Sequence, residues 1–112
     1  MPISEDTGRK HLERFRAPAS IREELTELAT QGGSLVWARP GLAPAQRSIA
    51  TISVLVSLGR LGALREHLEI GKANGLSERE MCEAIMQCGV YAGFPAMVEA
   101  MEVAADVFDG PA

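Results

Sequence analysis

The sequence predicts an all-α fold, a compact bundle of several helices, on two observations. Apolar residues recur at spacings of three and four along most of the chain, which is the period of a helix with one buried face. Residues typical of helix starts and stops separate these stretches, and no neighbouring runs alternate as paired strands do. The 112 residues have the length of one domain. We expect an N-terminal arm over residues 1–19 and a single helical domain over residues 20–112.

The stretch from Ser20 to Gly33 predicts the first helix. Ser20 and Glu23 have the spacing of a capping box, and apolar residues follow at helical intervals. Two consecutive glycines, Gly32 and Gly33, are expected to end this helix. Residues 34–43 then read as a connector that contains a proline and a glycine.

The second predicted helix runs from Pro44 to Leu58. Proline is common in the first turn of a helix, because its missing N–H has no partner there in any case. From Ile49 onward the segment is almost wholly apolar, which predicts burial on all sides. Its Ile, Val and Thr residues are also compatible with a buried strand, but the length and the helical neighbours favour a helix.

Three more helices follow in the second half of the chain. The third reaches to about Ala73 and is expected to end at Asn74 and Gly75. A second capping box, formed by Ser77 and Glu80, begins the fourth helix. The last helix is expected to run from the proline of "AGFPA" through the final phenylalanine, with one stripe of apolar and small residues: Met97, Ala100, Met101, Ala104 and Val107 or Phe108.

Composition excludes several classes of function. The net charge of −4 argues against nucleic-acid binding, which requires a basic stripe. No apolar run reaches the length of about 18 residues that a membrane span needs, so no membrane partner is expected. The beginning "MPISEDTGRK" lacks the apolar segment of a secretory signal, which predicts a cytoplasmic protein. Hydrophobic residues make up 46% of the chain, and we expect part of them to be buried against other copies.

The two cysteines do not suggest redox or metal chemistry. Cys82 and Cys88 are six residues apart, so on one helix they point in directions about 120° apart and cannot form a disulfide. Their spacing also fits no zinc motif. We expect two buried, reduced thiols, no metal site and no cofactor.

His67 is the main candidate for chemistry, because an imidazole exchanges protons near neutral pH. Arg60, Ala63, Gly71 and Asn74 share its face of the helix. In one interpretation the small residues let a neighbouring helix approach closely, and His67 is an interior residue with a hydrogen bond. In the other interpretation they leave a concavity, in which His67 acts as a general acid or base.

Arg39 lies in the connector and Arg47 lies near the start of the second helix. Both arginines permit two interpretations. They can be surface or capping charges, or they can hold the carboxylate of a substrate. The sequence contains no phosphate-binding loop, nucleophile elbow or zinc-protease motif.

Two segments resemble the carboxymuconolactone decarboxylase family, "VWARPGLAPAQRS" and "LREHLEIGKANGLSEREMCEAIMQCGVYAGFPA". The likeness covers about residues 33–108. The matching residues, in the same order and spacing, are Trp37, Arg39, Pro40, Gly41, Leu42, Arg47, Ser48, His67, Leu68, Asn74, Gly75, Ile85, Met86, Gln87, Tyr91, Gly93, Pro95 and Ala96. The resemblance implies an all-α, cofactor-free protein that forms a ring-like homo-oligomer, a trimer or a hexamer.

The resemblance also implies roles for single residues. His67 would be the catalytic proton donor or acceptor. Arg47, Arg60 and Arg39 would bind a small anionic substrate, with Trp37 and Tyr91 as walls of its pocket.

The same superfamily includes alkylhydroperoxidase D-like proteins, which carry a glutamate and a CxxC pair before the histidine. The corresponding positions here are Val56, Arg60 and Ala63, so the redox motif is missing. The family's decarboxylases usually have an acidic residue four positions before the histidine, where this chain has Ala63. We therefore expect a cofactor-independent lyase whose substrate is a small anionic lactone or oxo-acid, in a catabolic or biosynthetic pathway. The alternatives are an isomerase or cyclase on a related substrate, and an oligomeric family member without catalytic activity.

Overall fold

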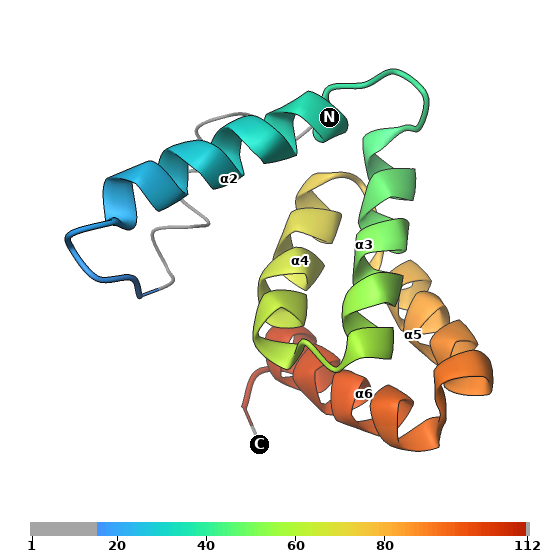
Figure 1. The fold of residues 1–112 in the computed structure, drawn as a ribbon. Helices are drawn as coiled ribbons and strands as arrows, with labels where there is room; N and C mark the ends of the chain where they lie inside the picture. Colours follow the sequence, from blue (N-terminus) through green and yellow to red (C-terminus); the bar gives the residue numbers. More distant parts are fainter. Residues whose placement is uncertain (1–15, 112) are drawn as a thin grey trace.

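A computed structural model describes residues 16–111, and this part of the chain is helical without any strand (Figure 1). This confirms the predicted all-α class. The helices are α2 (Arg22–Trp37), α3 (Pro44–Leu58), α4 (Leu61–Ala73), α5 (Glu78–Ala92) and α6 (Phe94–Asp109). Most of the predicted N-terminal arm, residues 1–15, lies outside the described residues.

Helices α3 to α6 form one bundle around a common core. Successive helices pack against each other as α3–α4 and α5–α6, and the two pairs join through α3–α5 and α4–α6. The buried side chains at the centre are Ile52, Val56, Leu64, Leu68, Leu76, Met81, Ile85, Cys88, Ala100, Val103 and Ala104. Each fully buried Leu or Ile side chain contributes about 1.5–3 kcal/mol by leaving water, so this cluster is the main source of the bundle's stability.

Helix α2 is separate from this bundle. It lies across the end at which α3 begins and α4 ends (Figure 1), and it makes few contacts with the four other helices. The connector between α2 and α3 is short, because α2 extends further along the chain than the sequence suggests.

The predicted glycine stop of α2 is wrong. The helix continues through Gly32 and Gly33 to Trp37, and neither glycine has a positive φ. A glycine costs about 1 kcal/mol in a helix relative to alanine, which weakens a helix without ending it. The helix ends where Pro40 forces the preceding Arg39 out of helical geometry.

The predicted capping box at the start of α2 is also wrong. The N-cap is Ile21, and no side chain caps the helix. A turn after Pro18 leads into the helix instead, with the N–H groups of Ile21 and Arg22 bonded to the Pro18 carbonyl at 3.1 and 3.0 Å. The Arg22 guanidinium donates to the carbonyl of Ala17, which fixes this turn in place of Ser20.

Helix α3 has the predicted bounds, but the expected burial on all sides is wrong for the single chain. One face, with Ser48, Ile52 and Val56, is buried in the bundle. On the outer face Val54 is 54% exposed and Leu58 is 65% exposed. The helix ends at Gly59, whose φ of 69° is the left-handed conformation that glycine adopts readily.

The other boundaries follow their local signals. Helix α4 ends at Asn74 and Gly75, where the N–H of Leu76 bonds to the Gly71 carbonyl and the N–H of Gly75 to that of Lys72. Helix α5 begins with the predicted capping box. The Glu80 N–H donates to Oγ of Ser77 at 3.0 Å, and the Ser77 N–H donates to Oε1 of Glu80 at 2.9 Å.

The predicted stripe of α6 is confirmed. Ala100 and Ala104 are buried in the core, and Met97, Met101, Val107 and Phe108 pack against it. Among the described residues no helix has both the length and the apolar character needed to cross a membrane. The expected cytoplasmic location stays a prediction.

Candidate functional site

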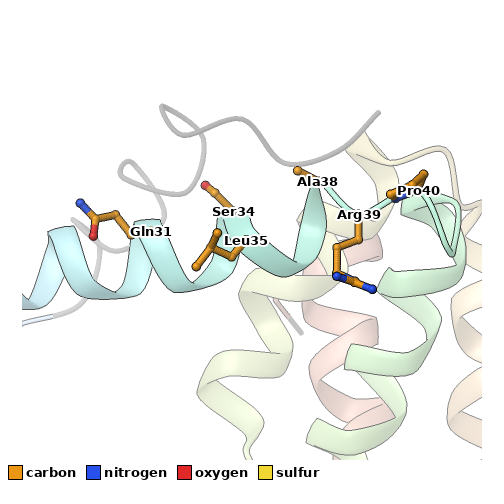
Figure 2. A pocket seen from close by; sticks show the side chains of 6 residues that line it. All are labelled: Gln31, Ser34, Leu35, Ala38, Arg39 and Pro40. Carbon is orange, nitrogen blue, oxygen red and sulfur yellow. The ribbon is translucent and has the colours of Figure 1, made fainter.

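The predicted arginines Arg39 and Arg47 meet at the end of the bundle beneath α2. A pocket of about 740 Å³ lies next to this point, along the second half of α2 and the connector, and is lined by Gln31, Ser34, Leu35, Ala38, Arg39 and Pro40. Figure 2 shows the side chain of Arg39 leaving the connector toward the bundle helices. The long α2 therefore supplies one side of this pocket, and the connector supplies the other.

Arg47 is held in place by the connector. It lies in the first turn of α3, and its Nη2 donates to the carbonyl oxygen of Arg39 at 3.1 Å. Its Nε is buried and has no hydrogen-bond partner among the residues that the structure describes. A buried donor without a partner costs about 1–3 kcal/mol, and more on a charged group. The guanidinium is thus a positioned cation with hydrogen-bonding capacity left for an anion.

Next to Arg47 a buried polar pair joins α3 to α4. The amide Nδ2 of Asn74 donates to Oγ of Ser48 at 3.0 Å, and both residues are buried. Because buried polar groups are costly unless bonded, this pair sets how the start of α3 and the end of α4 align. Sequence analysis treated Asn74 as a helix stop and as a residue on the face of His67, and missed its pairing with Ser48. The available clue was a serine and an asparagine among buried apolar residues.

His67 lies on α4, two turns before Asn74 on the same face, which places it about 10 Å along the helix from the buried pair. The residue is half-buried and its Nδ1 is buried. Gly71, one turn after it, lies under α5 and the loop before it, since an added Cβ would come within 2.7 Å of Sδ of Met81. The absence of a side chain at Gly71 therefore allows α5 to pack closely against α4. This agrees with the interpretation in which small residues near His67 permit close helix packing.

The structure separates Arg60 and Tyr91 from this end of the bundle. Arg60 is the exposed N-cap of α4, at the opposite end of α3 from Arg47 and about 18 Å away along that helix. Tyr91 is 84% exposed on the last turn of α5. Trp37 is half-buried at the last position of α2, next to the connector that carries Arg39.

The cysteines are free, as expected, but only Cys88 is buried. Its thiol donates to the carbonyl of Ser53 at 3.7 Å, which joins α5 to α3. Cys82 is half-buried, which corrects the expectation that both thiols are buried. Burial raises the pKa of the Cys82 thiol, and the carboxylates of Glu78, Asp109 and Glu83 raise this pKa further. The thiol therefore stays protonated at neutral pH.

Within residues 16–111 no three His, Cys, Asp or Glu side chains form a group that could hold a metal ion. The expectation of a cofactor-free protein stays a prediction.

Comparison with known proteins finds a matching family and three similar proteins. The model of the carboxymuconolactone decarboxylase family matches residues 23–106, three quarters of the chain. The chain is similar to a 4-carboxymuconolactone decarboxylase of Acinetobacter baylyi, with 48% identity over 73 residues, which are 65% of this chain and 54% of that protein.

Two further relatives are more distant. A nitrosuccinic acid decarboxylase of Metarhizium robertsii is 38% identical over 68 residues, 61% of this chain and 48% of its own length. An uncharacterized 15.0 kDa protein of Paracoccus denitrificans is 35% identical over 72 residues, 62% of this chain and 54% of its own. The chain thus spans about half the length of the curated relatives that it matches.

Proposed function

The chain belongs to the carboxymuconolactone decarboxylase family, and from this premise we propose that it removes carbon dioxide from a small anionic acid or lactone. The observation that carries the proposal is Arg47. Its guanidinium is fixed by the Arg39 carbonyl, and its buried Nε has no hydrogen-bond partner among the described residues. Such a group favours a bound anion, because the anion supplies the missing acceptor for Nε and balances the positive charge.

The chemistry needs an electron acceptor within the substrate. When the C–C bond to the departing carboxylate breaks, its electron pair moves into the rest of the molecule, and a proton must then be added to carbon. In a conjugated lactone the electrons form a dienolate, and a nitro group next to the reacting carbon accepts them in the same way. A protein therefore has to hold the acid, stabilise the developing negative charge and supply the proton.

We assign these tasks to residues at the α2 end of the bundle and to His67 in the middle of α4. Arg47 holds a carboxylate of the substrate, and Arg39 adds positive charge at the adjacent pocket. His67 supplies or accepts the proton, since the pKa of an imidazole suits this exchange near neutral pH. Trp37, at the last position of α2 beside the connector, is the proposed apolar contact for the substrate. Arg60 is a weaker candidate, because it lies at the far end of α3.

The substrate is proposed to differ from carboxymuconolactone itself. One turn before His67 the chain has Ala63, which is half-buried and cannot orient or charge the imidazole as a carboxylate would. It leaves space for a larger substrate group beside the ring. The two named relatives act on different acids according to their names, so a change of substrate within the family is a reasonable expectation.

The same residue favours a second candidate function, an oligomeric family member without catalytic activity. Without an acidic residue one turn before it, His67 lacks a carboxylate that would assist proton transfer, and the methyl group of Ala63 cannot replace that carboxylate. An isomerase or cyclase that uses the same dienolate chemistry is a further variant of the first proposal.

A substrate panel tests the proposal. Purified protein is incubated with 4-carboxymuconolactone, nitrosuccinic acid and related small polycarboxylic acids, and the release of carbon dioxide is followed. We expect one of these acids to react, and we expect Arg47→Met to lower kcat/KM for it by about 10- to 100-fold, the loss of one or more charged hydrogen bonds. Arg65→Met, a change of an exposed arginine on α4, serves as the control. If none of these acids reacts or binds, the result contradicts the proposed decarboxylation and favours the non-catalytic family member.

A further inference from the structure

Helix α2 presents its apolar side outward. Thr26 and Thr30 are buried and Trp37 is half-buried on one side of the helix. At 100° per residue the opposite side carries the apolar residues. These are Ile21, Leu25, Leu28, Leu35 and Val36, which are 45–76% exposed. A continuous row of exposed apolar side chains indicates a surface that a binding partner covers.

The spacing of this row is that of paired helices. Ile21, Leu25, Leu28, Gly32 and Leu35 follow each other at steps of four, three, four and three, the repeat of a coiled-coil seam. Gly32 occupies one position of the seam, and a Cβ built there would meet no atom within 4 Å. The seam therefore has a gap at Gly32 that accepts a large side chain from another helix.

The bundle does not supply that helix. Helix α2 makes few contacts with α3 to α6, and a helix of 16 residues is only marginally stable by itself in water. Burial of the exposed apolar row would therefore add to the stability of the helix.

We propose that the apolar row of α2 packs against the same row of a second copy of this chain, with the two helices antiparallel. The charges of α2 argue for this occupant and direction. Its carboxylates, Glu23, Glu24 and Glu27, all lie in the first half of the helix, and residues 28–38 carry no charge. A parallel pair would bring the carboxylates of both copies together. An antiparallel pair places each acidic half beside an uncharged half and opposes the two helix dipoles.

The antiparallel arrangement also fills the gap in the seam. When the midpoints of the two helices coincide, Leu28 of one copy lies at Gly32 of the other, and Leu25 lies beside Leu35. Leu28 of each copy thus fills the gap at Gly32 of the other, once on each side of a two-fold axis, which is the commonest symmetry of dimers. Leu35 belongs both to the row and to the wall of the pocket in Figure 2, so the second copy would border the pocket that holds Arg39.

Crosslinking of single cysteines tests the pairing and its direction. Each cysteine is introduced in a Cys82→Ser background, and the protein is treated with a short bismaleimide. In the antiparallel pair the two Leu28 positions are only about 6 Å apart along the helix axis, whereas the two Leu35 positions are about 15 Å apart. We expect covalent dimers from Leu28→Cys and none from Leu35→Cys. The control is Glu27→Cys, an exposed position on the same helix that points away from the row.

Each other pattern overturns the proposal. Dimers from both Leu28→Cys and Leu35→Cys indicate parallel helices. Dimers from Glu27→Cys as well indicate random collision. No dimer from Leu28→Cys indicates that something else, such as another face of the protein or residues 1–15, covers the row.

A charge in the row gives a second, independent measurement. Leu28→Glu puts two carboxylates near the axis, and we expect the mass of the assembly in light scattering to fall by half or more while the helical circular dichroism of the bundle remains. Leu28→Met should keep the original mass. A folded Leu28→Glu protein with unchanged mass would overturn the pairing. Because neither measurement uses activity, the result does not depend on the proposed decarboxylation.

Discussion

His67 is the residue whose proposed role is most directly testable. It is half-buried on α4, on the face that also carries the buried Asn74. If His67 transfers the proton, His67→Ala should lower turnover of the accepted acid by about 10²- to 10⁴-fold without changing the mass of the assembly. Carbon dioxide release and light scattering measure the two effects. His67→Gln keeps a hydrogen-bonding side chain of similar size and should be equally slow. A stable His67→Ala protein with full turnover would remove the histidine from the mechanism.

Ala63 decides the expected substrate preference. We expect the wild type to decarboxylate 4-carboxymuconolactone far more slowly than a typical enzyme rate of about 10 s⁻¹. Ala63→Glu places a carboxylate one turn before His67, where it raises the pKa of the imidazole and orients the ring, so this variant should react faster. Ala63→Gln has nearly the same size without the charge and should not. Lactone absorbance follows the reaction, and rapid turnover by the wild type would show that Ala63 has no such effect.

Cys82 gives a prediction for pH dependence. Burial and three nearby carboxylates raise the pKa of its thiol, so the fraction of reactive thiolate near pH 8 is smaller than for a free cysteine. We expect alkylation by iodoacetamide to be slow at pH 8 and to rise at higher pH. The midpoint of this rise in the folded protein should lie above that of the urea-unfolded protein.

Mass spectrometry of the Cys82 peptide gives the rate, and equal midpoints in both states would contradict the raised pKa. Because the proposed mechanism does not use Cys82, its alkylation should leave activity largely unchanged.

At the scale of the element, α4 shows how two glycines of one helix differ. Gly71 is buried, and a Cβ there would come within 2.7 Å of the fully buried Met81 and 3.4 Å of Ile52. Gly62 is exposed, with no atom within 4 Å of such a Cβ.

We therefore expect Gly71→Ala to lower the free energy of unfolding by about 1–3 kcal/mol through overpacking. Gly62→Ala, the matched control, should raise this free energy by up to about 1 kcal/mol, because alanine favours the helix. Urea unfolding followed by circular dichroism measures both variants. A stabilised Gly71→Ala protein would show that the helices can separate without cost.

At the scale of the whole molecule, exposed apolar side chains remain on several helices. Besides the row on α2, Val54 and Leu58 of α3 and Val90 and Phe94 near the end of α5 are 54–72% exposed. A two-fold contact through α2 combined with a three-fold contact through these residues would generate a closed hexamer. Of the trimer and hexamer expected from the family, the hexamer contains such a two-fold contact.

We therefore expect a hexamer of about 72 kDa from a chain of 12.0 kDa, measured by light scattering at low micromolar concentration. A monomer of 12 kDa under these conditions would contradict the prediction.

Much of the fold could be read from local patterns. The capping box of α5, the asparagine and glycine after α4 and the proline in the first turn of α3 satisfy backbone groups within a few residues of themselves. Interactions of this range depend on neighbouring residues alone, so spacing predicts them. The start and the end of α2 were predicted incorrectly, because the Arg22 side chain bonds to Ala17 and Pro40 ends the helix more effectively than two glycines.

The sequence by itself determined the helical class, four of the helices and the residues that could do acid–base or anion chemistry, since these depend on residue type and spacing. Only the tertiary structure decided which of those residues meet. It brings Arg47 to the Arg39 carbonyl, joins Ser48 to Asn74 across 26 positions of sequence, and leaves Arg60 and Tyr91 elsewhere. It also buries Thr26 and Thr30 of α2 and leaves the leucines of the opposite side exposed. These outcomes depend on how whole helices align when the shared core is buried, and no spacing within one helix contains that information.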